Sequence, residues 1–290
     1  MIKNLEAEDR LKTLIDMAFA EDLGTGDLAT QVIFPESRKA EAYLIAKADG
    51  VISGLEIAKM VLEHFGPLED FTPHVKDGDR VTKGQKILDF RGDYAHLLSS
   101  ERIMLNFLQR MSGIATATRH YVDLLSGTRT RILDTRKTLP GYRYTDKMAV
   151  LHGGGMNHRM GLYDMCLLKD NHITVSGGVR QAIEAARAGL PVSVKIEIET
   201  ETLPQVKEAL DAGADIIMLD NMDIPTMRRA VEMISGRAKT EASGNITSDN
   251  IAQIARETGV DFISSGALTH SVKALDISMK FTKTSDLQTK

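Results

Sequence analysis

The segment from Val194 to Asp220, VKIEIETETLPQVKEALDAGADIIMLD, decides the fold of the second half of this chain. It opens and closes with short stretches of strand character, Val194 to Glu199 and Asp215 to Asp220, and each ends on an acidic residue. A strand, a loop and a helix repeated at a short period are typical of a parallel α/β sheet. The segment therefore predicts neighbouring parallel strands with acidic groups at their carboxyl ends.

The same rhythm continues on both sides of this segment and predicts six strands, separated by helices such as 179–188 and 247–257. The strands are Arg131 to Thr135, Met165 to Lys169, Val194 to Glu199, Asp215 to Asp220, Ala238 to Ala242 and Asp261 to Ser265. In parallel α/β barrels, functional groups gather where strands end and the following loops begin. The predicted ends carry Asp134 with Arg136 and Lys137, then Lys169, Glu199, Asp220, Ser243-Gly244 and Ser264-Ser265-Gly266.

Before residue 130 the predicted elements alternate irregularly, which is typical of an α+β unit. A strand is expected from Ala42 to Lys47, a helix from Leu55 to Phe65, and a tight hairpin that pairs Val75 to Val81 with Gln85 to Phe90. A long amphipathic helix follows from Tyr94 to Leu125, with Gly113 as its expected interruption. We expect this helix to link two domains.

The stretch from residue 129 to residue 172 carries an excess of positive charge. It holds eight basic residues against four acidic ones, whereas the whole chain has a formal net charge of −4. The basic residues are Arg129, Arg131, Arg136, Lys137, Arg143, Lys147, Arg159 and Lys169. Arg offers a planar fork for carboxylate or phosphate, and glycines such as Gly153-Gly154-Gly155 let backbone N–H groups approach a ligand. A solvated surface is the alternative, but the arrangement favours a site for a ligand with several negative charges.

Composition narrows the class of protein. With 290 residues and 42% hydrophobic content, the chain is long enough for two domains, and no apolar run is long enough to span a bilayer. We therefore expect a cytoplasmic protein without a membrane partner. Mild acidity, the absence of Trp and an aromatic content of 5% argue against a nucleic-acid partner. The single cysteine, Cys166, lies in an apolar run, which favours a small buried side chain over a nucleophile.

The strand around Glu197 places charges on one face. Lys195, Glu197 and Glu199 alternate with apolar residues, so the period of two sends all three side chains to the same side. We expect that side to be the barrel interior, with Lys195 and Glu197 as an internal ion pair. Glu199 and Asp220, at strand ends, could hold Mg²⁺ together with substrate phosphate oxygens, or could bind ribose hydroxyls.

Two late loops have the composition of a phosphate site. Glu241 to Asn245 and Ile263 to Ala267 each follow a predicted strand and precede a predicted helix, where hydroxyls and helix amides can bind phosphate. The histidines between residues 150 and 175 match no zinc-ligand spacing, so zinc is not expected. His158, beside Arg159, is expected to donate a hydrogen bond to an anionic oxygen.

Together these motifs resemble the quinolinate phosphoribosyltransferase family, the type II phosphoribosyltransferases, over nearly the whole chain. The resemblance is carried by Glu21-Asp22-Leu23-Gly24, Glu101-Arg102, Leu105-Asn106, Ser112-Gly113-Ile114-Ala115-Thr116, Asp134-Thr135-Arg136-Lys137-Thr138, Asn157-His158-Arg159, Lys169-Asp170-Asn171-His172, Leu219-Asp220-Asn221 and Glu241-Ala242-Ser243-Gly244. It implies an α/β fold with an N-terminal α+β sandwich domain over residues 1–112 and an open α/β barrel of about six parallel strands over residues 113–274. It also implies that a tail of about 275–290 packs back on the first domain.

The resemblance implies a pentosyltransferase that joins quinolinate to the phosphoribosyl group of phosphoribosyl pyrophosphate. The products are nicotinate mononucleotide, pyrophosphate and CO₂, a step of NAD biosynthesis, with Mg²⁺ accompanying phosphoribosyl pyrophosphate. It implies a homodimer in which Arg102 reaches the neighbouring active site. It assigns catalysis to Lys137, Glu199 and Asp220, and a shared metal site to Glu199 and Asp220. The substrate-binding residues that it implies are Arg102, Arg136, Lys137, His158, Arg159, Lys169, Glu199, Asp220, Ser243, Gly244, Ser265, Gly266 and His270.

Two other functions remain open. A nicotinate-specific phosphoribosyltransferase would use a similar site and release no CO₂, and a catalytically silent ligand-binding protein would bind without turnover. The molybdenum-transport-associated relative of the family is disfavoured, because it looks different around the segment Lys169 to His172 that this chain retains.

Overall fold

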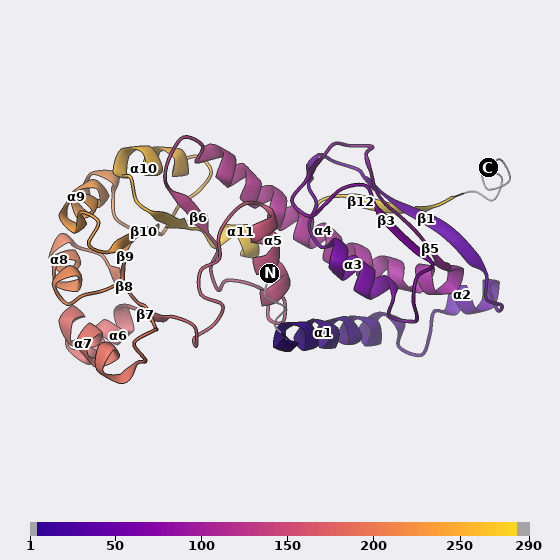
Figure 1. Cartoon of the computed structure of the whole chain (residues 1–290), viewed down its shortest axis with the longest axis horizontal. Helices are drawn as coiled ribbons and strands as arrows, with labels where there is room; N and C mark the ends of the chain where they lie inside the picture. The colour runs from indigo at the N-terminus through magenta and orange to yellow at the C-terminus, as the bar shows by residue number, and fades with distance from the viewer. Residues whose placement is uncertain (1–4, 283–290) are drawn as a thin grey trace. The chain divides into compact units, whose positions relative to one another are not determined.

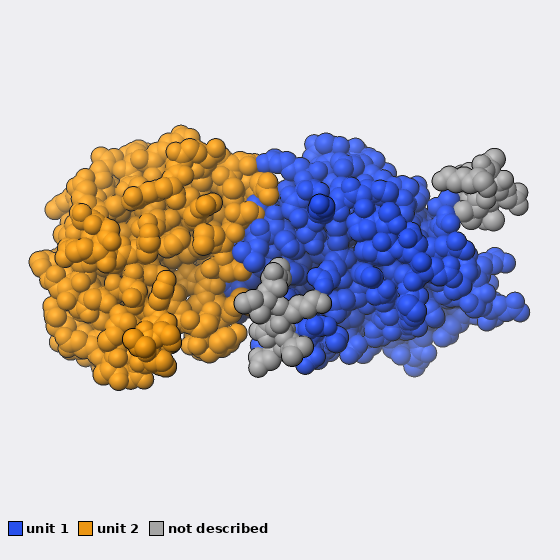
Figure 2. All heavy atoms as spheres, viewed as in Figure 1, with its two compact units in different colours: residues 1–117, 140–153, 272–290 blue, residues 118–139, 154–271 orange. Residues whose placement is uncertain are grey.

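The computed structural model describes residues 5–282 and divides the chain into two compact units, which Figure 2 shows in different colours. Unit 1 comprises residues 1–117, 140–153 and 272–290, and unit 2 comprises residues 118–139 and 154–271. One division falls inside helix α4 (Tyr94–Leu124), the helix that also contains the expected domain boundary at residues 112 and 113. Each unit has a sheet of its own.

Unit 1 is built on a four-stranded antiparallel sheet in the order β12-β1-β5-β3 (Figure 1). Its strands are β1 (Lys39–Ala46), β3 (Asp70–Pro73), β5 (Lys86–Asp93) and β12 (Ile277–Phe281). Alternate residues of β1, namely Ala42, Leu44 and Ala46, are buried, as expected for a strand with one face on a core. Because β12 pairs with β1, the C-terminal part of the described chain lies on this sheet. The rest of the expected tail, 283–290, lies outside the described residues.

Helices supply the other buried surface of unit 1. Besides α4 they are α1 (Leu5–Leu23), α2 (Leu28–Ile33), α3 (Leu55–Leu62) and α5 (Arg143–His152). The expected interruption of α4 at Gly113 is wrong, because the helix is continuous through that residue. A Cβ at Gly113 would clash with the carbonyl oxygen of Lys273, so glycine lets the segment that leads to β12 pass close to the helix.

The expected hairpin between residues 75–81 and 85–90 is wrong in its pairing. Strand β4 (Arg80–Val81) pairs with β2 (Gly50–Val51), whereas β5 pairs with β1 and β3. Backbone hydrogen bonds from Gly78 to the Ile52 carbonyl (2.8 Å) and from Ile52 to the Asp79 carbonyl (3.0 Å) hold the turn against the β2 segment. Local alternation indicates which residues are extended but does not identify a partner that is distant in the sequence.

Unit 2 contains a six-stranded sheet in the order β6-β11-β10-β9-β8-β7, with every ladder parallel. The strands are β6 (Arg131–Leu133), β7 (Cys166–Leu168), β8 (Ile196–Thr200), β9 (Ile216–Asp220), β10 (Lys239–Ser243) and β11 (Phe262–Ser264). Strands β6 and β7 form the two edges, and no ladder joins them within the described residues. The expected mixed fold, with six parallel strands in an open barrel, is confirmed.

The helices of unit 2 follow the strands in turn. They are α6 (Asp170–Ser176), α7 (Val179–Gly189), α8 (Leu203–Asp211), α9 (Ile224–Ile234), α10 (Ile251–Thr258) and α11 (Ala267–His270), and Figure 1 shows α7 to α10 on the outer side of the curved sheet. Local caps define where they begin. Thr202 accepts a hydrogen bond from the Gln205 N–H at the start of α8, and Asp223 accepts one from the Thr226 N–H at the start of α9. Among residues 5–282, no helix is both long and apolar enough to cross a membrane.

Candidate active site

The carboxyl ends of the six strands bring the expected polar residues to one edge of the sheet. Asp134 follows β6, Lys169 follows β7, Glu199 lies near the end of β8, and Asp220, Ser243 and Ser264 end β9, β10 and β11. Because all six strands are parallel and belong to one sheet, their carboxyl ends lie together along one end of the sheet, which we call the carboxyl edge. The carboxyl edge, which is distinct from the edge strands β6 and β7, is the candidate active site.

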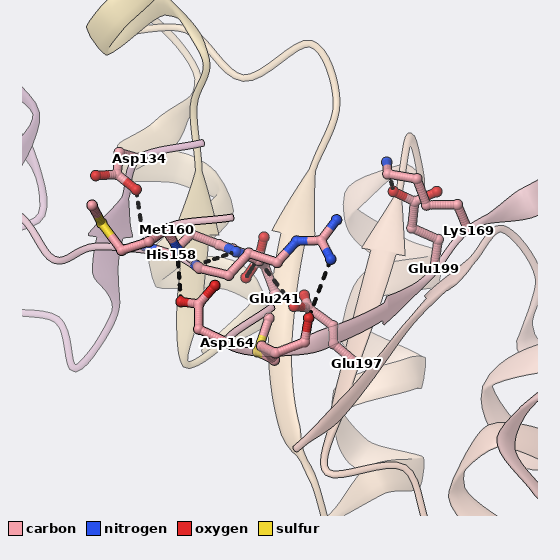
Figure 3. Close-up of polar contacts among 10 residues, drawn as sticks. Asp134, His158, Met160, Asp164, Lys169, Glu197, Glu199 and Glu241 are labelled. Carbon is pink, nitrogen blue, oxygen red and sulfur yellow. Dashed lines mark hydrogen bonds and ion pairs between the residues drawn. The ribbon is translucent and has the colours of Figure 1, made fainter. Parts of the chain in front are cut away.

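Lys169 and Glu199 form an ion pair at this edge (Figure 3). The Lys169 Nζ atom lies 2.5 Å from Glu199 Oε1, and the two side chains are 46% and 15% exposed. The pair joins the residue after β7 to β8, and water reaches both partners. An anionic substrate can therefore approach the Lys169 ammonium while Glu199 keeps its carboxylate at the sheet edge.

The loop between α5 and β7 is anchored by a buried carboxylate. Asp134 is fully buried, and it accepts hydrogen bonds from the Asn157 side-chain amide (2.6 Å) and from the His158 backbone N–H (2.9 Å). Figure 3 shows Asp134 beside the His158 segment. Charge-assisted hydrogen bonds of this kind are stronger than neutral ones, so Asp134 fixes the start of the loop that carries His158 and Arg159.

The imidazole of His158 points into the barrel interior rather than outward. Its Nδ1 accepts a hydrogen bond of 2.7 Å from the Arg159 backbone N–H, and its Nε2 lies 3.0 Å from Glu197 Oε2 and 3.6 Å from Glu241 Oε2 (Figure 3). The side chains of Glu197 and Glu241 are almost completely buried. Both ring nitrogens therefore face groups of the protein, which differs from the expectation that His158 donates to a substrate oxygen.

Arg159 is a buried cation close to a second one. Only 8% of its surface is exposed, and its Nη1 donates a hydrogen bond of 3.2 Å to the Met165 carbonyl. Burial lowers the pKa of the Arg159 guanidinium, the positive charge of Arg136 lowers that pKa further, and Glu197 raises it. Arg136 and Arg159 thus share one electrostatic environment, as a site for a doubly charged ligand requires.

Gly266 brings together two more of the expected residues. A Cβ at this position would lie 2.8 Å from Lys137 Cδ and 2.9 Å from His270 Cδ2, so both side chains pack against the bare backbone of the loop after β11. The Thr269 hydroxyl donates a hydrogen bond of 2.9 Å to the Lys137 carbonyl. The loops after β6 and β11 are therefore joined at Lys137.

The loops after β9 and β10 are joined in a similar way. Gly244 has a φ of +91°, and a Cβ there would clash with the Asn221 side-chain oxygen. Asn221 donates hydrogen bonds to Asp220 Oδ2 (2.9 Å) and to the Ser243 carbonyl (3.0 Å), and its own Oδ1 accepts one from Asn245 (3.0 Å). Asn221 thus connects Asp220 to the expected phosphate loop, a role that the residue type alone did not indicate. The helix expected to begin at Thr247 begins at Ile251.

Two expectations about buried charges need correction. Lys195 is exposed and precedes β8, so the expected internal ion pair between Lys195 and Glu197 is wrong; Glu197 faces His158 instead. Glu241, on β10, was not expected at the site as a separate group. The sequence signal that could have indicated Glu241 is an acidic residue inside a buried strand, two positions before the last residue of the strand, Ser243. Glu197 likewise lies two positions before Glu199.

Arg102 belongs to unit 1, on α4, where its side chain is exposed. It lines a pocket of about 360 Å³ together with Asp22, Asp27, Leu98 and Ser99. Asp27 caps α2 by accepting hydrogen bonds from the backbone N–H and the hydroxyl of Thr30. Arg102 is therefore available to an anion that approaches unit 1.

Two groups of residues are candidates for a metal. Nitrogen and carboxylate oxygen atoms of His158, Glu197 and Glu241 lie within 4.8 Å of one another. However, the Arg159 N–H occupies Nδ1, so the ring proton belongs on Nε2, and a protonated Nε2 is a donor rather than a metal ligand. Glu199 and Asp220, on adjacent strands at the sheet edge, fit Mg²⁺ better, because Mg²⁺ uses one or two carboxylates together with substrate phosphates and water.

The lone thiol has no place in this chemistry. Burial raises the pKa of the Cys166 thiol, which keeps the thiol protonated. The fold and the site therefore define an open-barrel protein whose strand ends and loops carry cations and carboxylates, a combination that suits an anionic substrate.

Comparison with known proteins identifies the group to which this barrel protein belongs. Residues 27–112 match the N-terminal domain, and residues 114–280 the C-terminal domain, of the quinolinate phosphoribosyl transferase family models. The chain belongs to the quinolinate phosphoribosyl transferase family.

Curated relatives and solved structures agree. The chain is 47% identical over 276 residues to a probable carboxylating nicotinate-nucleotide pyrophosphorylase of Bacillus subtilis, covering 94% of each chain. It is 47% identical over 289 residues to the chloroplastic carboxylating nicotinate-nucleotide pyrophosphorylase of Arabidopsis thaliana, covering 93% of this chain and 82% of the relative. The crystal structure of NadC from Streptococcus pyogenes superposes with a TM-score of 0.90 at 43% identity, covering 94% of this chain and 96% of that chain.

Proposed function

We propose that this chain transfers the phosphoribosyl group of phosphoribosyl pyrophosphate to quinolinate and releases CO₂, giving nicotinate mononucleotide and pyrophosphate in NAD biosynthesis. The observation that carries the proposal is the placement of Arg136, Lys169, Glu199 and Asp220 at the carboxyl ends of parallel strands in one sheet, together with buried Arg159, whose pKa the charge of Arg136 lowers. Quinolinate carries two carboxylates, so paired guanidinium groups match its charge. The family match supports the same substrate.

The reaction forms a bond between the pyridine nitrogen and the ribose anomeric carbon. As pyrophosphate leaves, positive charge builds on the sugar, and the carboxylates of Glu199 and Asp220 stabilise that charge. Lys137, packed at Gly266, neutralises the departing pyrophosphate, and the Gly244 and Ser265-Gly266 loops bind the phosphate of the sugar. Mg²⁺, when bound with the pyrophosphate, supplies further neutralising charge.

Decarboxylation follows on the ribosylated ring. The positively charged pyridinium accepts the electron pair that remains when the carboxylate next to nitrogen leaves as CO₂, and the ring carbon then takes a proton. The protein contributes by orienting the dicarboxylate with Arg136, Arg159 and Lys169. No side-chain nucleophile is required, in agreement with the protonated thiol of Cys166.

The activity is tested by supplying purified protein with Mg²⁺, phosphoribosyl pyrophosphate and either quinolinate or nicotinate. We expect CO₂ and the mononucleotide from quinolinate and poor reaction of nicotinate. Equal use of nicotinate would support a nicotinate-specific enzyme, and binding without product would support a silent ligand-binding protein. The Asp220→Asn variant should bind quinolinate and fail to turn it over.

The partner that we propose is a second copy of this chain, with Arg102 completing the neighbouring active site. Exposed apolar residues on α2, at Leu28 (76%), Val32 (80%) and Ile33 (65%), are a surface that association would cover. We further propose a cytoplasmic location for the chain, although its curated plant relatives are chloroplastic and mitochondrial.

Subunit mixing tests the shared site. Arg102→Ala and Arg136→Ala homodimers should each be almost inactive. After denaturation and joint refolding, hybrid dimers contain one intact site, so about a quarter of the wild-type activity should return. If mixing restores nothing while light scattering shows dimers, Arg102 acts in its own subunit or not at all.

A further inference from the structure

A buried carboxyl pair lies behind the site described above. Glu197 on β8 and Glu241 on β10 are 0% and 1% exposed, and Figure 3 shows both side chains directed toward His158. Within the described residues, Glu197 Oε1 and Glu241 Oε1 have no hydrogen-bond partner, and Glu197 Oε2 makes a contact of 3.0 Å with His158 Nε2. Burying two carboxyl groups with so few partners is costly, so a pair retained in this position calls for an explanation beyond packing.

His158 connects this pair to the substrate-binding loop. The Nε2 atom lies 3.0 Å from Glu197, while Nδ1 accepts the Arg159 backbone N–H and the backbone N–H of His158 is held by Asp134. The residue is thus held at three points: the ring contacts Glu197 on the barrel and the Arg159 backbone on the loop, and the backbone N–H is bound by Asp134 after β6. Turning the ring away from Glu197 would break the hydrogen bond at the Arg159 backbone.

Glu197 also acts on Arg159 directly through charge. Its carboxylate favours the charged guanidinium, which burial and Arg136 disfavour. Two cations that are brought together to bind a dianion repel each other before substrate arrives, and a buried acid behind them offsets that repulsion. Glu197 is therefore placed to hold Arg159 close to Arg136.

We propose that Glu197 and Glu241 are positioning residues that act through His158 to hold Arg159 in the orientation that binds the quinolinate dicarboxylate. Glu197 supplies the negative charge, and Glu241 supplies a second carboxyl group, whose Oε2 atom lies 3.6 Å from the same His158 Nε2 atom. This assignment rests on the proposed function, since it names the groups that set the affinity for one of the two substrates. A metal at the same three residues is disfavoured by the hydrogen bond at Nδ1.

The test compares Glu197→Gln, Glu241→Gln and the control Glu232→Gln, a residue exposed on α9. For Glu197→Gln we expect the KM for quinolinate to rise at least tenfold while the KM for phosphoribosyl pyrophosphate changes less than threefold. The control Glu232→Gln should stay within threefold of wild type for both substrates, and Glu241→Gln, which keeps a side chain of the same shape, should raise the quinolinate KM less than Glu197→Gln does. Equal effects on both KM values, or a quinolinate KM unchanged in Glu197→Gln, would overturn the proposal.

A second measurement does not depend on activity. ¹⁵N spectra of histidine-labelled protein should show His158 protonated on Nε2 in the wild type, and in Glu197→Gln this signal should shift or broaden while the other histidines stay unchanged. An unperturbed His158 signal in that variant would contradict the positioning role even if quinolinate proves not to be the substrate. Conversely, a wild type that shows the expected spectrum but no turnover would refute the proposed function alone. Circular dichroism melting of each variant identifies any loss of fold.

Discussion

The Lys169 ammonium lies 2.5 Å from the Glu199 carboxylate, and this contact joins the segment after β7 to the neighbouring strand β8. The Lys169 side chain is 46% exposed, and pairs with such access to water contribute only about 0–1 kcal/mol to stability. The contact therefore matters more for ligand binding than for folding.

Replacing Lys169 with Gln should separate these two effects. We expect the free energy of unfolding to change by less than about 1 kcal/mol, because the pair is exposed. We expect kcat/KM to fall on the order of 10²-fold, because a cation that faces the anionic substrate is lost. Denaturant titration and steady-state kinetics check the two halves. A large loss of stability with intact kinetics would assign Lys169 to the fold instead.

Arg136 and Arg131 provide a matched comparison on β6. Both side chains are exposed, but Arg131 begins the strand whereas Arg136 follows its carboxyl end. Arg136→Ala should lose most of its turnover with the melting temperature nearly unchanged, since exposed substitutions usually alter stability by about 0.5 kcal/mol or less. Arg131→Ala should leave turnover unchanged. Similar losses of turnover in both variants would mean that a position after the carboxyl end of β6 does not determine which arginine acts on the substrate.

Glu241 should make stability depend on pH. Burial, and then the charge of Glu197, raise the pKa of Glu241 well above its ordinary 4.5, so the folded chain holds a proton that the unfolded chain releases. Protonated Glu241 contributes fully to the free energy of unfolding below pH 4.5. This contribution is lost as the pH rises through the raised pKa, by at most about 1.4 kcal/mol per pH unit.

Glu241→Gln removes that proton equilibrium. Relative to the wild type, the variant should therefore gain stability as the pH rises from 4.5 through the raised pKa of Glu241. Urea titrations of both proteins across this range measure the difference. A stability difference that stays constant with pH would show that Glu241 is ionised in the folded chain.

Gly266→Ala should uncouple activity from stability. The backbone at Gly266 is right-handed, with φ −69°, so alanine fits it and can stabilise the chain by about 0.4–1 kcal/mol. The added methyl group would displace Lys137 and His270, whose carbons lie 2.8 and 2.9 Å from its position, and kcat/KM should fall about tenfold.

Gly189→Ala is the control for this variant, because nothing lies within 4 Å of a Cβ at that position. It should retain full activity. If Gly266→Ala is as active as Gly189→Ala, then the packing of Lys137 against Gly266 is not required for activity.

The strand ends were predictable from the sequence because each lies where a short apolar run meets a polar residue, as at Leu219 and Asp220. Pairing in unit 1 was not, since β4 takes a partner, β2, from a distant part of the chain. The orientation of His158 was also hidden, because the two carboxyl groups that it faces come from strands β8 and β10. Residue type indicated a polar group but not the direction in which it points.

The central claim is that cations from separate loops orient one dicarboxylate, that the barrel carboxylates assist the transfer of the phosphoribosyl group to it, and that the ribosylated ring then loses CO₂. Quinolinate labelled with ¹⁴C in the carboxylate next to nitrogen, or in the other carboxylate, tests this claim with phosphoribosyl pyrophosphate and Mg²⁺ present. The account predicts that label from the first position leaves as CO₂ in equal amount to the mononucleotide formed, and that label from the second stays in the mononucleotide. Mononucleotide without CO₂, or neither product, would contradict it.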